Sequence, residues 1–208
     1  MKGVNMVQYK KDTIKEKIDS AALKIFGEKG YENTKISNIS VEAKVSVGNI
    51  YRYYKSKEEI FYSVAPESVL EKLKSILINK VILAKNKELN GGESISKFHL
   101  INEEFVEYFI SNKEQVLIMV NGSKGTRYEG IKDEIVNYMI ETVKKHYLKE
   151  KDEIIHDSMN YDIIKMIYEK LIEMMMHVLK ESKSPEDIKK SFEIINFYHL
   201  FGVINLFK

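Results

Sequence analysis

The chain has 208 residues, a formal net charge of +2 and no cysteine. Without cysteine it has no disulfide framework, no thiolate nucleophile and no cysteine-based metal site. Its first residues lack the apolar core of a signal peptide and no apolar run approaches the length that spans a bilayer, so the sequence predicts a cytoplasmic protein.

Helical periodicity dominates the chain, which contains only two prolines and ten glycines. Apolar residues recur at the spacing of amphipathic helices, and no segment alternates convincingly as a β-strand does. We therefore expect an all-α protein with an N-terminal head, residues 1–62, and a larger helical domain, residues 63–208. The first helix is predicted to begin at the capping box Thr13–Glu16 and to end near Gly30.

Two very short helices joined by a tight turn are predicted after the first helix. The turn is Lys44–Ser46, and Ser46 is a candidate N-cap for the second short helix. Apolar residues at helical spacing on both helices can face one shared core. These core residues are Ile36, Ile39, Ala43, Ile50 and Tyr54.

The second short helix leaves an outward face that contains no acidic residue, which suits a groove lined by phosphates. Residues 1–63 also carry 12 Lys and Arg against 8 Asp and Glu, a net +4, whereas the remainder is net −2. Together these features predict a helix-turn-helix that reads DNA. The outward residues are Val47, Gly48, Asn49, Tyr51, Arg52 and Tyr53.

A longer set of residues fits a known pattern: Tyr31, Thr34, Ile36, Ile39, Ala43 and the run Val45–Glu58. This set resembles the N-terminal DNA-binding domain of the TetR family of transcriptional regulators. The resemblance covers residues 10–62, and the rest agrees only in length and helical pattern. Lys44 stands where the family usually has a glycine, and a lysine in the left-handed conformation of that turn costs up to about 1 kcal/mol. The alternative is a three-helix packing unit that shares only this spacing.

The resemblance implies which residues contact DNA. The segment Ser46–Asn49 matches the part nearest the bases, where Asn49 can read adenine bidentately and Gly48 leaves room for the duplex. Tyr54, whose counterpart in the family is usually phenylalanine, is expected in the core. Positions that touch phosphates in relatives correspond to Thr34, Lys35, Tyr51, Tyr53 and Lys57. The complete predicted DNA-binding set is Thr34, Lys35, Ser46, Val47, Gly48, Asn49, Tyr51, Arg52, Tyr53 and Lys57.

A second capping box, Ser56–Glu59, begins a helix whose apolar residues continue to Val81. This helix is the predicted connection between the head and the larger domain, with a kink or break at Pro66. Asn90–Gly92 is the clearest helix breaker, and three further helices are expected between it and the last two helices of the chain. The second of these three ends before the loop Asn121–Gly125, and the third carries the apolar residues Ile131, Ile135, Tyr138, Met139 and Val143.

The last two helices, about residues 160–181 and 185–206, are apolar on two faces. Because such helices need two partners, they predict a homodimer through a four-helix interface. One thick core that buries both faces within a single chain is the alternative. The pattern leaves open which stripe meets the partner. The stripes are Ile164, Ile167, Leu171, Met175 and Val178 or Ile163, Met166 and Met174 in the first helix, and Ile188, Phe192, Ile195, His199, Gly202 and Leu206 or Ile194, Phe197, Phe201 and Ile204 in the second.

The resemblance also implies a repressor that binds palindrome-like DNA as a dimer and is released by a small, often apolar effector. No cofactor is implied, and the effector is not named by any motif. Sites within helical bundles are apolar with a few polar groups, although each such residue alone is more often part of a core. The candidate effector residues are Phe98, Phe105, Tyr108, Phe109, Met119, Tyr138, Met166, Met174 and His177.

Two other functions stay open at this point. A helical-bundle metalloenzyme would use Glu153 with His156, or Glu173 with His177, but a di-iron site needs two Glu-x-x-His pairs and only the first pair has that spacing. A constitutive DNA binder would have the same head and no ligand. The sequence contains no nucleophile triad or phosphate loop, so we expect no catalytic activity.

Overall fold

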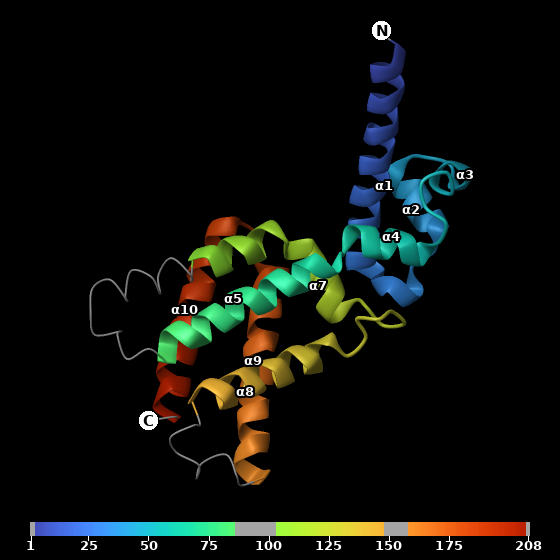
Figure 1. Ribbon diagram of the computed structural model, residues 1–208. Coiled ribbons are helices and arrows are strands. Elements are labelled where there is room, and N and C mark those ends of the chain that lie inside the picture. Colours follow the sequence, from blue (N-terminus) through green and yellow to red (C-terminus); the bar gives the residue numbers. More distant parts are fainter. Residues whose placement is uncertain (1–2, 86–102, 148–157, 207–208) are drawn as a thin grey trace. The chain divides into compact units, whose positions relative to one another are not determined.

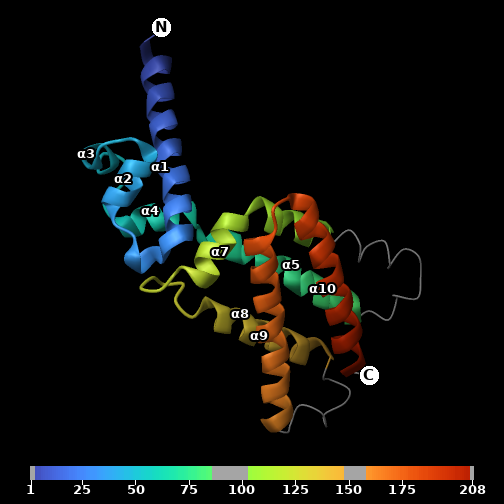
Figure 2. The same ribbon diagram turned by 180° about the vertical axis from the view of Figure 1, so that it is seen from behind.

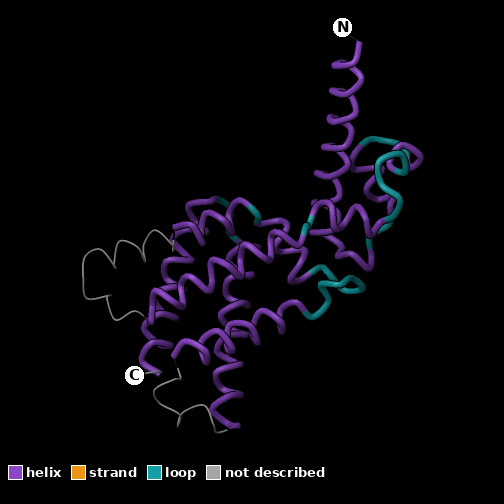
Figure 3. Tube along the Cα trace, viewed as in Figure 1, coloured by secondary structure: helices purple, strands orange, loops and turns teal. Residues whose placement is uncertain are grey.

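The computed structural model describes residues 3–85, 103–147 and 158–206. These ranges contain helices and connecting loops but no strand, which confirms the all-α prediction (Figure 1, Figure 3). None of the described helices is long and apolar enough to cross a membrane. Asn90–Gly92 and the pair Glu153 and His156 lie outside the described residues. The helices are α1 (Gly3–Asn33), α2 (Ile36–Ala43), α3 (Val47–Ile50), α4 (Lys57–Val64), α5 (Glu67–Lys85), α7 (Lys113–Asn121), α8 (Ile131–Tyr147), α9 (Ser158–Glu181) and α10 (Pro185–Leu206), with a further helical stretch at residues 103–111.

The first helix is longer than its predicted capping box implied. α1 begins at Gly3 rather than at Thr13, so the predicted start is wrong. Residues 4–26 contain neither glycine nor proline, and a helix once formed gains one hydrogen bond for each residue it adds. The predicted end is confirmed, because Gly30 has φ 72° and ψ 167° and interrupts the regular helix before the last residues of α1.

The interruption at Pro66 is also confirmed, since α4 ends at Val64 and α5 begins at Glu67. Proline has no backbone N–H to donate, so it cannot continue the helix of the preceding residues. At the other end of α4, the Ser56 hydroxyl oxygen accepts the Glu59 N–H at 3.0 Å. The Glu59 carboxylate in turn accepts the N–H of Lys55 at 2.6 Å, so the predicted cap is present.

The chain divides into two compact units. The first contains Met1–Val69 and Glu114–Glu129, and the second contains Leu70–Lys113 and Gly130–Lys208. The predicted head, residues 1–62, lies within the first unit. Helix α7 and the loop that follows it belong to the same unit as the head, although they come much later in the sequence. The chain therefore passes between the units three times, after residues 69, 113 and 129.

The core of the first unit lies where α1 packs against α2 and α4, with α3 packed against α2 (Figure 2). The rings of Phe26 and Phe61 meet edge to face, with centroids 5.1 Å apart. The predicted core is confirmed except that Ile36 is only half-buried. The buried residues include Ile18, Ala22, Ile25, Ile39, Ala43, Ile50, Tyr54, Ile60 and Val64.

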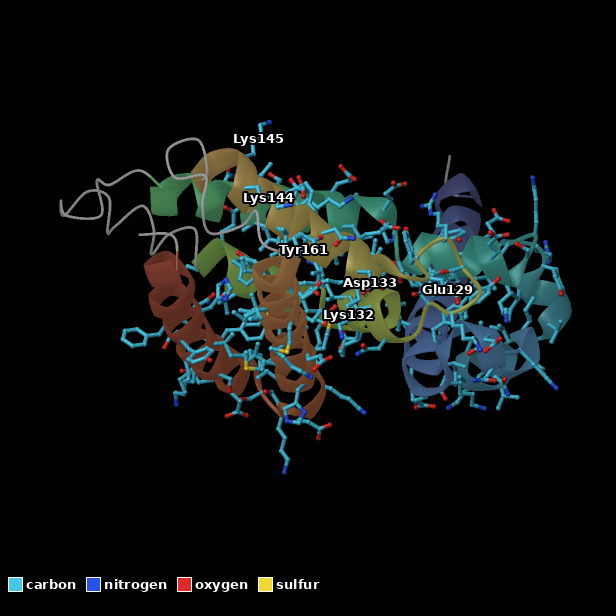
Figure 4. All side chains as sticks on the ribbon, turned by 90° about the horizontal axis from the view of Figure 1, so that it is seen from below. Glu129, Lys132, Asp133, Lys144, Lys145 and Tyr161 are labelled. Atoms are coloured by element: carbon cyan, nitrogen blue, oxygen red, sulfur yellow. The ribbon has the colours of Figure 1, made fainter. Side chains whose placement is uncertain are left out.

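In the second unit, α9 packs against both α8 and α10 (Figure 2). Between α8 and α9, the Lys132 ammonium lies 2.8 Å from the Glu173 carboxylate. The Lys144 ammonium lies 4.7 Å from the ring centroid of Tyr161, and both of these residues are labelled in Figure 4. One apolar stripe of each terminal helix is buried in part. Ile164, Leu171 and Met175 of α9 and Ile188 and Phe192 of α10 are buried, whereas Ile167, Val178, Ile195 and His199 of the same stripes are half-buried.

The other stripe is exposed. Ile163 and Met166 of α9 are 43% and 51% exposed, and Ile194 and Phe197 of α10 are 72% and 66% exposed. The described residues therefore do not form the single thick core that would bury both faces. Among the residues whose burial the structure describes, this second stripe is therefore the more exposed of the two.

Candidate nucleic-acid interface

The turn between α2 and α3 is held by side-chain caps. The Ser46 hydroxyl oxygen accepts the N–H of Asn49 at 3.2 Å, which confirms Ser46 as the N-cap of α3. On the other side of the turn, the Ser40 hydroxyl donates to the carbonyl oxygen of Val45 at 2.6 Å. These two bonds fix the angle between the short helices.

Lys44 adopts the left-handed conformation that the turn requires, with φ 56° and ψ 39°. It is the only residue other than glycine with a positive φ in the described part of the chain. Its N–H donates to the carbonyl oxygen of Val41 at 3.2 Å, so the strained conformation closes the end of α2. The turn geometry that is usual for glycine is therefore kept by a lysine.

Helix α3 presents a short exposed face without an acid. Val47, Gly48, Tyr51 and Arg52 are exposed, and Val47 and Tyr51 are large apolar side chains of which 37% and 53% is exposed. Asn49 is half-buried, as is Tyr53, and Ser46 is exposed. The structure thus gathers most of the predicted DNA-contacting residues on one small surface.

Tyr54 is buried in the core, as predicted, and its hydroxyl also contacts two polar side chains. The phenol donates to the Asp19 carboxylate of α1 and lies 3.1 Å from the Ser63 hydroxyl of α4. Lys15 forms an ion pair with Asp19 at 2.7 Å, and that hydrogen bond raises the pKa of the Lys15 ammonium. Tyr54 therefore ties the segment that follows α3 to both α1 and α4, which a phenylalanine could not do by hydrogen bonding.

Thr34 is not available to a phosphate through its side chain. The residue is 2% exposed, and its hydroxyl donates to the carbonyl oxygen of Gly30 at 2.7 Å. This corrects the contact that the resemblance implied. Lys35, the next residue, is exposed, and its backbone N–H donates to the Asn38 side-chain oxygen at 3.0 Å, so Lys35 stands at the start of α2.

Lys57 is half-buried at the start of α4. Its ammonium donates to the carbonyl oxygens of Tyr31 at 2.7 Å and Thr34 at 2.9 Å, and it lies 4.1 Å from the Tyr31 ring centroid. Burial lowers the pKa of this ammonium. The predicted phosphate contact of Lys57 thus competes with two short bonds inside the protein.

The loop after α7 also contacts the head, and the sequence pattern did not predict it. The carbonyl oxygen of Gly122 accepts the Tyr31 N–H at 2.7 Å, and the Tyr128 hydroxyl donates to the buried carbonyl oxygen of Ala65 at 3.1 Å. We call residues 122–129 the docking loop. The motif Asn121–Gly125 marked a loop in the sequence, but nothing local indicated its target.

Arg127 makes the most extensive side-chain contact of the docking loop. Its guanidinium lies 4.3 Å from the ring centroid of Tyr62 and 3.3 Å from the Glu67 carboxylate. Its backbone N–H donates to the Tyr62 hydroxyl oxygen at 2.9 Å. Side chain and backbone of one residue therefore hold the end of α4 and the start of α5.

The predicted effector residues do not all lie in the same compact unit. Met119 lies in the first unit, whereas the other described candidates lie in the second. Met166, Met174 and His177 are exposed on α9, so they do not face the interior site that was predicted for them. The remaining described candidates are Phe105 and Phe109, which are buried, and Tyr108 and Tyr138, which are half-buried; Phe98 lies outside the described residues.

The metal-site alternative gains no support from the described residues. In that part of the chain, no group of three His, Asp or Glu side chains could hold an ion. The Glu173 carboxylate accepts hydrogen bonds from Lys132 at 2.8 Å and Lys170 at 2.7 Å, which lower its pKa to about 2. Glu173 is therefore committed to two ammonium groups.

Comparison with known proteins matches this geometry. A family model described as bacterial regulatory proteins, tetR family, matches residues 18–64, which run from the buried part of α1 to the end of α4. Residues 18–64 of the chain are the N-terminal DNA-binding segment of the TetR family. Proteins of this family are DNA-binding regulators rather than enzymes.

Individual TetR-family relatives match mainly in the head. The HTH-type transcriptional regulator HbdR of Aromatoleum sp. (strain CIB) is 48% identical over 48 residues, which are 23% of this chain and 21% of that protein. The transposon Tn10 TetC protein of Escherichia coli is 29% identical over 107 residues, which are 51% of this chain and 49% of that protein. The chain thus spans about half the length, or less, of these relatives.

A solved structure resembles the chain beyond the head. The crystal structure of a TetR-like transcriptional regulator from Rhodococcus sp. RHA1 is 15% identical, with a TM-score of 0.50 over 91% of this chain and 96% of that chain. At this identity the likeness concerns the fold alone. It extends the TetR-family arrangement beyond the head to the helical C-terminal region.

Proposed function

We propose that this TetR-family protein is a sequence-specific DNA-binding transcriptional regulator that acts as a repressor. The observation that supports this most strongly is α3 itself: a helix capped by Ser46 that exposes a small face without any carboxylate. An acid-free face of this kind suits the major groove, where base edges lie between two rows of phosphates.

The position of each residue along α2 and α3 determines whether it contacts a base or a phosphate in the proposed complex with DNA. Base edges are contacted by the first turn of α3, where Asn49 accepts and donates to adenine and Gly48 lets the backbone approach. Apart from the two neighbouring residues and the backbone of α3 itself, no heavy atom lies within 4 Å of the place where a side chain at Gly48 would begin, so the surface there is open. Phosphates are contacted by Lys35, Tyr51, Arg52 and Tyr53.

The regulator binds DNA as a homodimer through the exposed stripe of α9 and α10. Apolar side chains exposed this far on two adjacent helices are typical of an interface, because water contact with them is unfavourable. A two-fold axis then pairs the two helices with the same two helices of a second chain. Two heads on one axis suit a palindrome-like operator.

A small, apolar effector releases the protein from DNA by binding within the second unit. The residues that support such a site are Phe105, Tyr108, Phe109 and Tyr138, which combine aromatic rings with two phenols. Residues 114–129, which include α7 and the docking loop, are joined covalently to the second unit at both ends. A movement within the second unit can therefore be transmitted to the head through these two connections as well as through α5.

A ligand-free regulator is the second candidate. One observation favours it: the rings of Phe105, Phe109 and Phe192 pack against one another, with centroids 4.7 Å apart for Phe105 and Phe109 and 5.4 Å apart for Phe109 and Phe192. Rings packed this closely leave little space for a ligand between them. In this case the same head would bind DNA constitutively.

Fluorescence anisotropy titrations of the full chain test the proposal. A duplex selected from random DNA should bind much more tightly than its scrambled version, and binding of both should weaken as salt rises. Equal affinity for both duplexes at every salt concentration would contradict sequence-specific recognition. Adding apolar metabolites to the selected complex then separates the effector-released repressor, which dissociates, from the ligand-free regulator, which does not.

A further inference from the structure

The Lys57 side chain is bound to the backbone where α1 ends and α2 begins. We call this segment, residues 31–35, the corner of the head. Two of the three ammonium donors have carbonyl acceptors at 2.7 and 2.9 Å, and the Glu32 carbonyl oxygen lies at 3.5 Å. These carbonyls follow Gly30, where α1 departs from helical geometry, and the Tyr31 carbonyl oxygen also accepts the backbone N–H of Thr34 at 3.2 Å. The ammonium therefore caps the end of α1 from the first turn of α4.

The same corner determines where α2 begins. The Thr34 carbonyl oxygen accepts one of the hydrogen bonds from Lys57, and the buried Thr34 hydroxyl donates to the carbonyl oxygen of Gly30. Lys35, directly after it, is the N-cap residue of α2. Because α2 and the capped turn position α3, a displacement of this corner displaces the exposed face that is proposed to read DNA.

The opposite side of the corner is held by the docking loop. The Tyr31 N–H donates to Gly122, while the Tyr31 carbonyl oxygen accepts from Lys57 and the Tyr31 ring lies under the same ammonium. Tyr31 is thus fixed from two directions by residues distant in the sequence. A lysine that is used in this way has few donors left for a phosphate.

We propose that Lys57 is a positioning residue, which holds the corner between α1 and α2 and thereby orients α3, and that it does not contact a phosphate. This inference rests on the proposed DNA binding, and it reassigns one residue of the interface. It separates Lys57 from Lys35, which is exposed on the same edge of the head and is proposed to contact a phosphate.

Salt dependence distinguishes the two roles. Each phosphate contact adds about 0.9 to the slope of log affinity against log salt for B-DNA. Lys57→Met, which keeps most of the aliphatic stem, should lower affinity for the selected duplex about tenfold, as expected for a lost hydrogen bond from a charged group, and leave the slope unchanged. Lys35→Met is the matched control and should reduce the slope by about 0.9. These titrations are made well below the unfolding temperature, where a loss of global stability does not change affinity.

Amide hydrogen exchange without DNA gives a second readout. Lys57→Met should speed exchange at residues 35–38 more than at residues 18–26 in the regular part of α1, whereas Lys35→Met should change neither. A reduced salt slope for Lys57→Met, or exchange at residues 35–38 equal to that of the wild type, would overturn the positioning role. If the wild type itself shows no salt-dependent DNA binding, the proposed function fails, and the exchange measurement still decides whether Lys57 holds the corner.

Discussion

The backbone N–H of Tyr31 donates a 2.7 Å hydrogen bond to the carbonyl oxygen of Gly122. This bond joins the end of α1 to the docking loop, and both residues belong to the first compact unit. The carbonyl oxygen of the same residue, Tyr31, accepts a hydrogen bond from the Lys57 ammonium. Tyr31 therefore contacts both the docking loop and the lysine that holds the start of α2. The helix-turn-helix is therefore supported by residues far outside the segment that defines its family.

Tyr128 should contribute to the stability of the first unit through its hydroxyl. Tyr128→Phe leaves the buried carbonyl oxygen of Ala65 without this donor, so the free energy of unfolding should fall by ~1–3 kcal/mol. Tyr51→Phe is the control, because Tyr51 is exposed and its change should stay within about 0.5 kcal/mol. Chemical denaturation measures both, and equal values for the two variants would show that the Tyr128 bond is not stabilising.

Lys44 should be a site at which glycine stabilises the protein. Glycine adopts a positive φ without the clash of a Cβ atom, so Lys44→Gly should raise the free energy of unfolding by up to about 1 kcal/mol. Lys44→Ala keeps the Cβ atom and therefore the strain, so it should give no comparable gain. Thermal unfolding of the two variants decides the matter, and a destabilised glycine variant would show that the lysine conformation carries no significant strain.

Asn49 and Arg52 should differ in how they affect specificity. Asn49→Ala should reduce discrimination between the selected and scrambled duplexes by ~1–3 kcal/mol if its contact to adenine is bidentate. Arg52→Ala should weaken both duplexes about equally and reduce the salt slope by about 0.9. Titrations on both duplexes compare the variants. The base-reading role of Asn49 would be rejected by an equal loss on every sequence.

Ile194 should mark the dimer interface. Ile194→Glu introduces a charge without a partner into the proposed apolar seam, so it should produce monomers and lower operator affinity. Ser75→Glu adds the same charge at an exposed position of α5 and should leave the oligomer intact. Light scattering at micromolar concentration reports the mass of each variant, and a monomeric wild type would contradict the dimer.

Local features of the head could be predicted from the sequence because their causes are local. Ser46 caps the helix that follows it directly, and Lys44 must take a positive φ because the turn is only three residues long. The bounds of α9 and α10 followed from apolar spacing in the same way. Such features depend on residues within a few positions of one another.

Other features could not be predicted, because they depend on partners distant in the chain. The family pattern assigns Thr34 and Lys57 to phosphates, but their donors are used by backbone carbonyls, which no side-chain pattern records. In α8 the buried line contains Val136 and Ile140, one position from the predicted Ile135 and Met139, because the face that a helix buries is decided by its neighbours. The attachment of the docking loop to the head has the same cause.

The most direct test of the central claim is the selection of duplexes from random DNA by the wild-type protein, followed by sequencing of those it retains. A dimer with two recognition helices predicts an inverted repeat whose half-sites lie about one helical turn apart or at a multiple of it. The same selection with Asn49→Ala should relax the base preference at one position in each half-site while the spacing persists. Retained duplexes without any shared sequence or repeat would contradict a DNA-reading regulator.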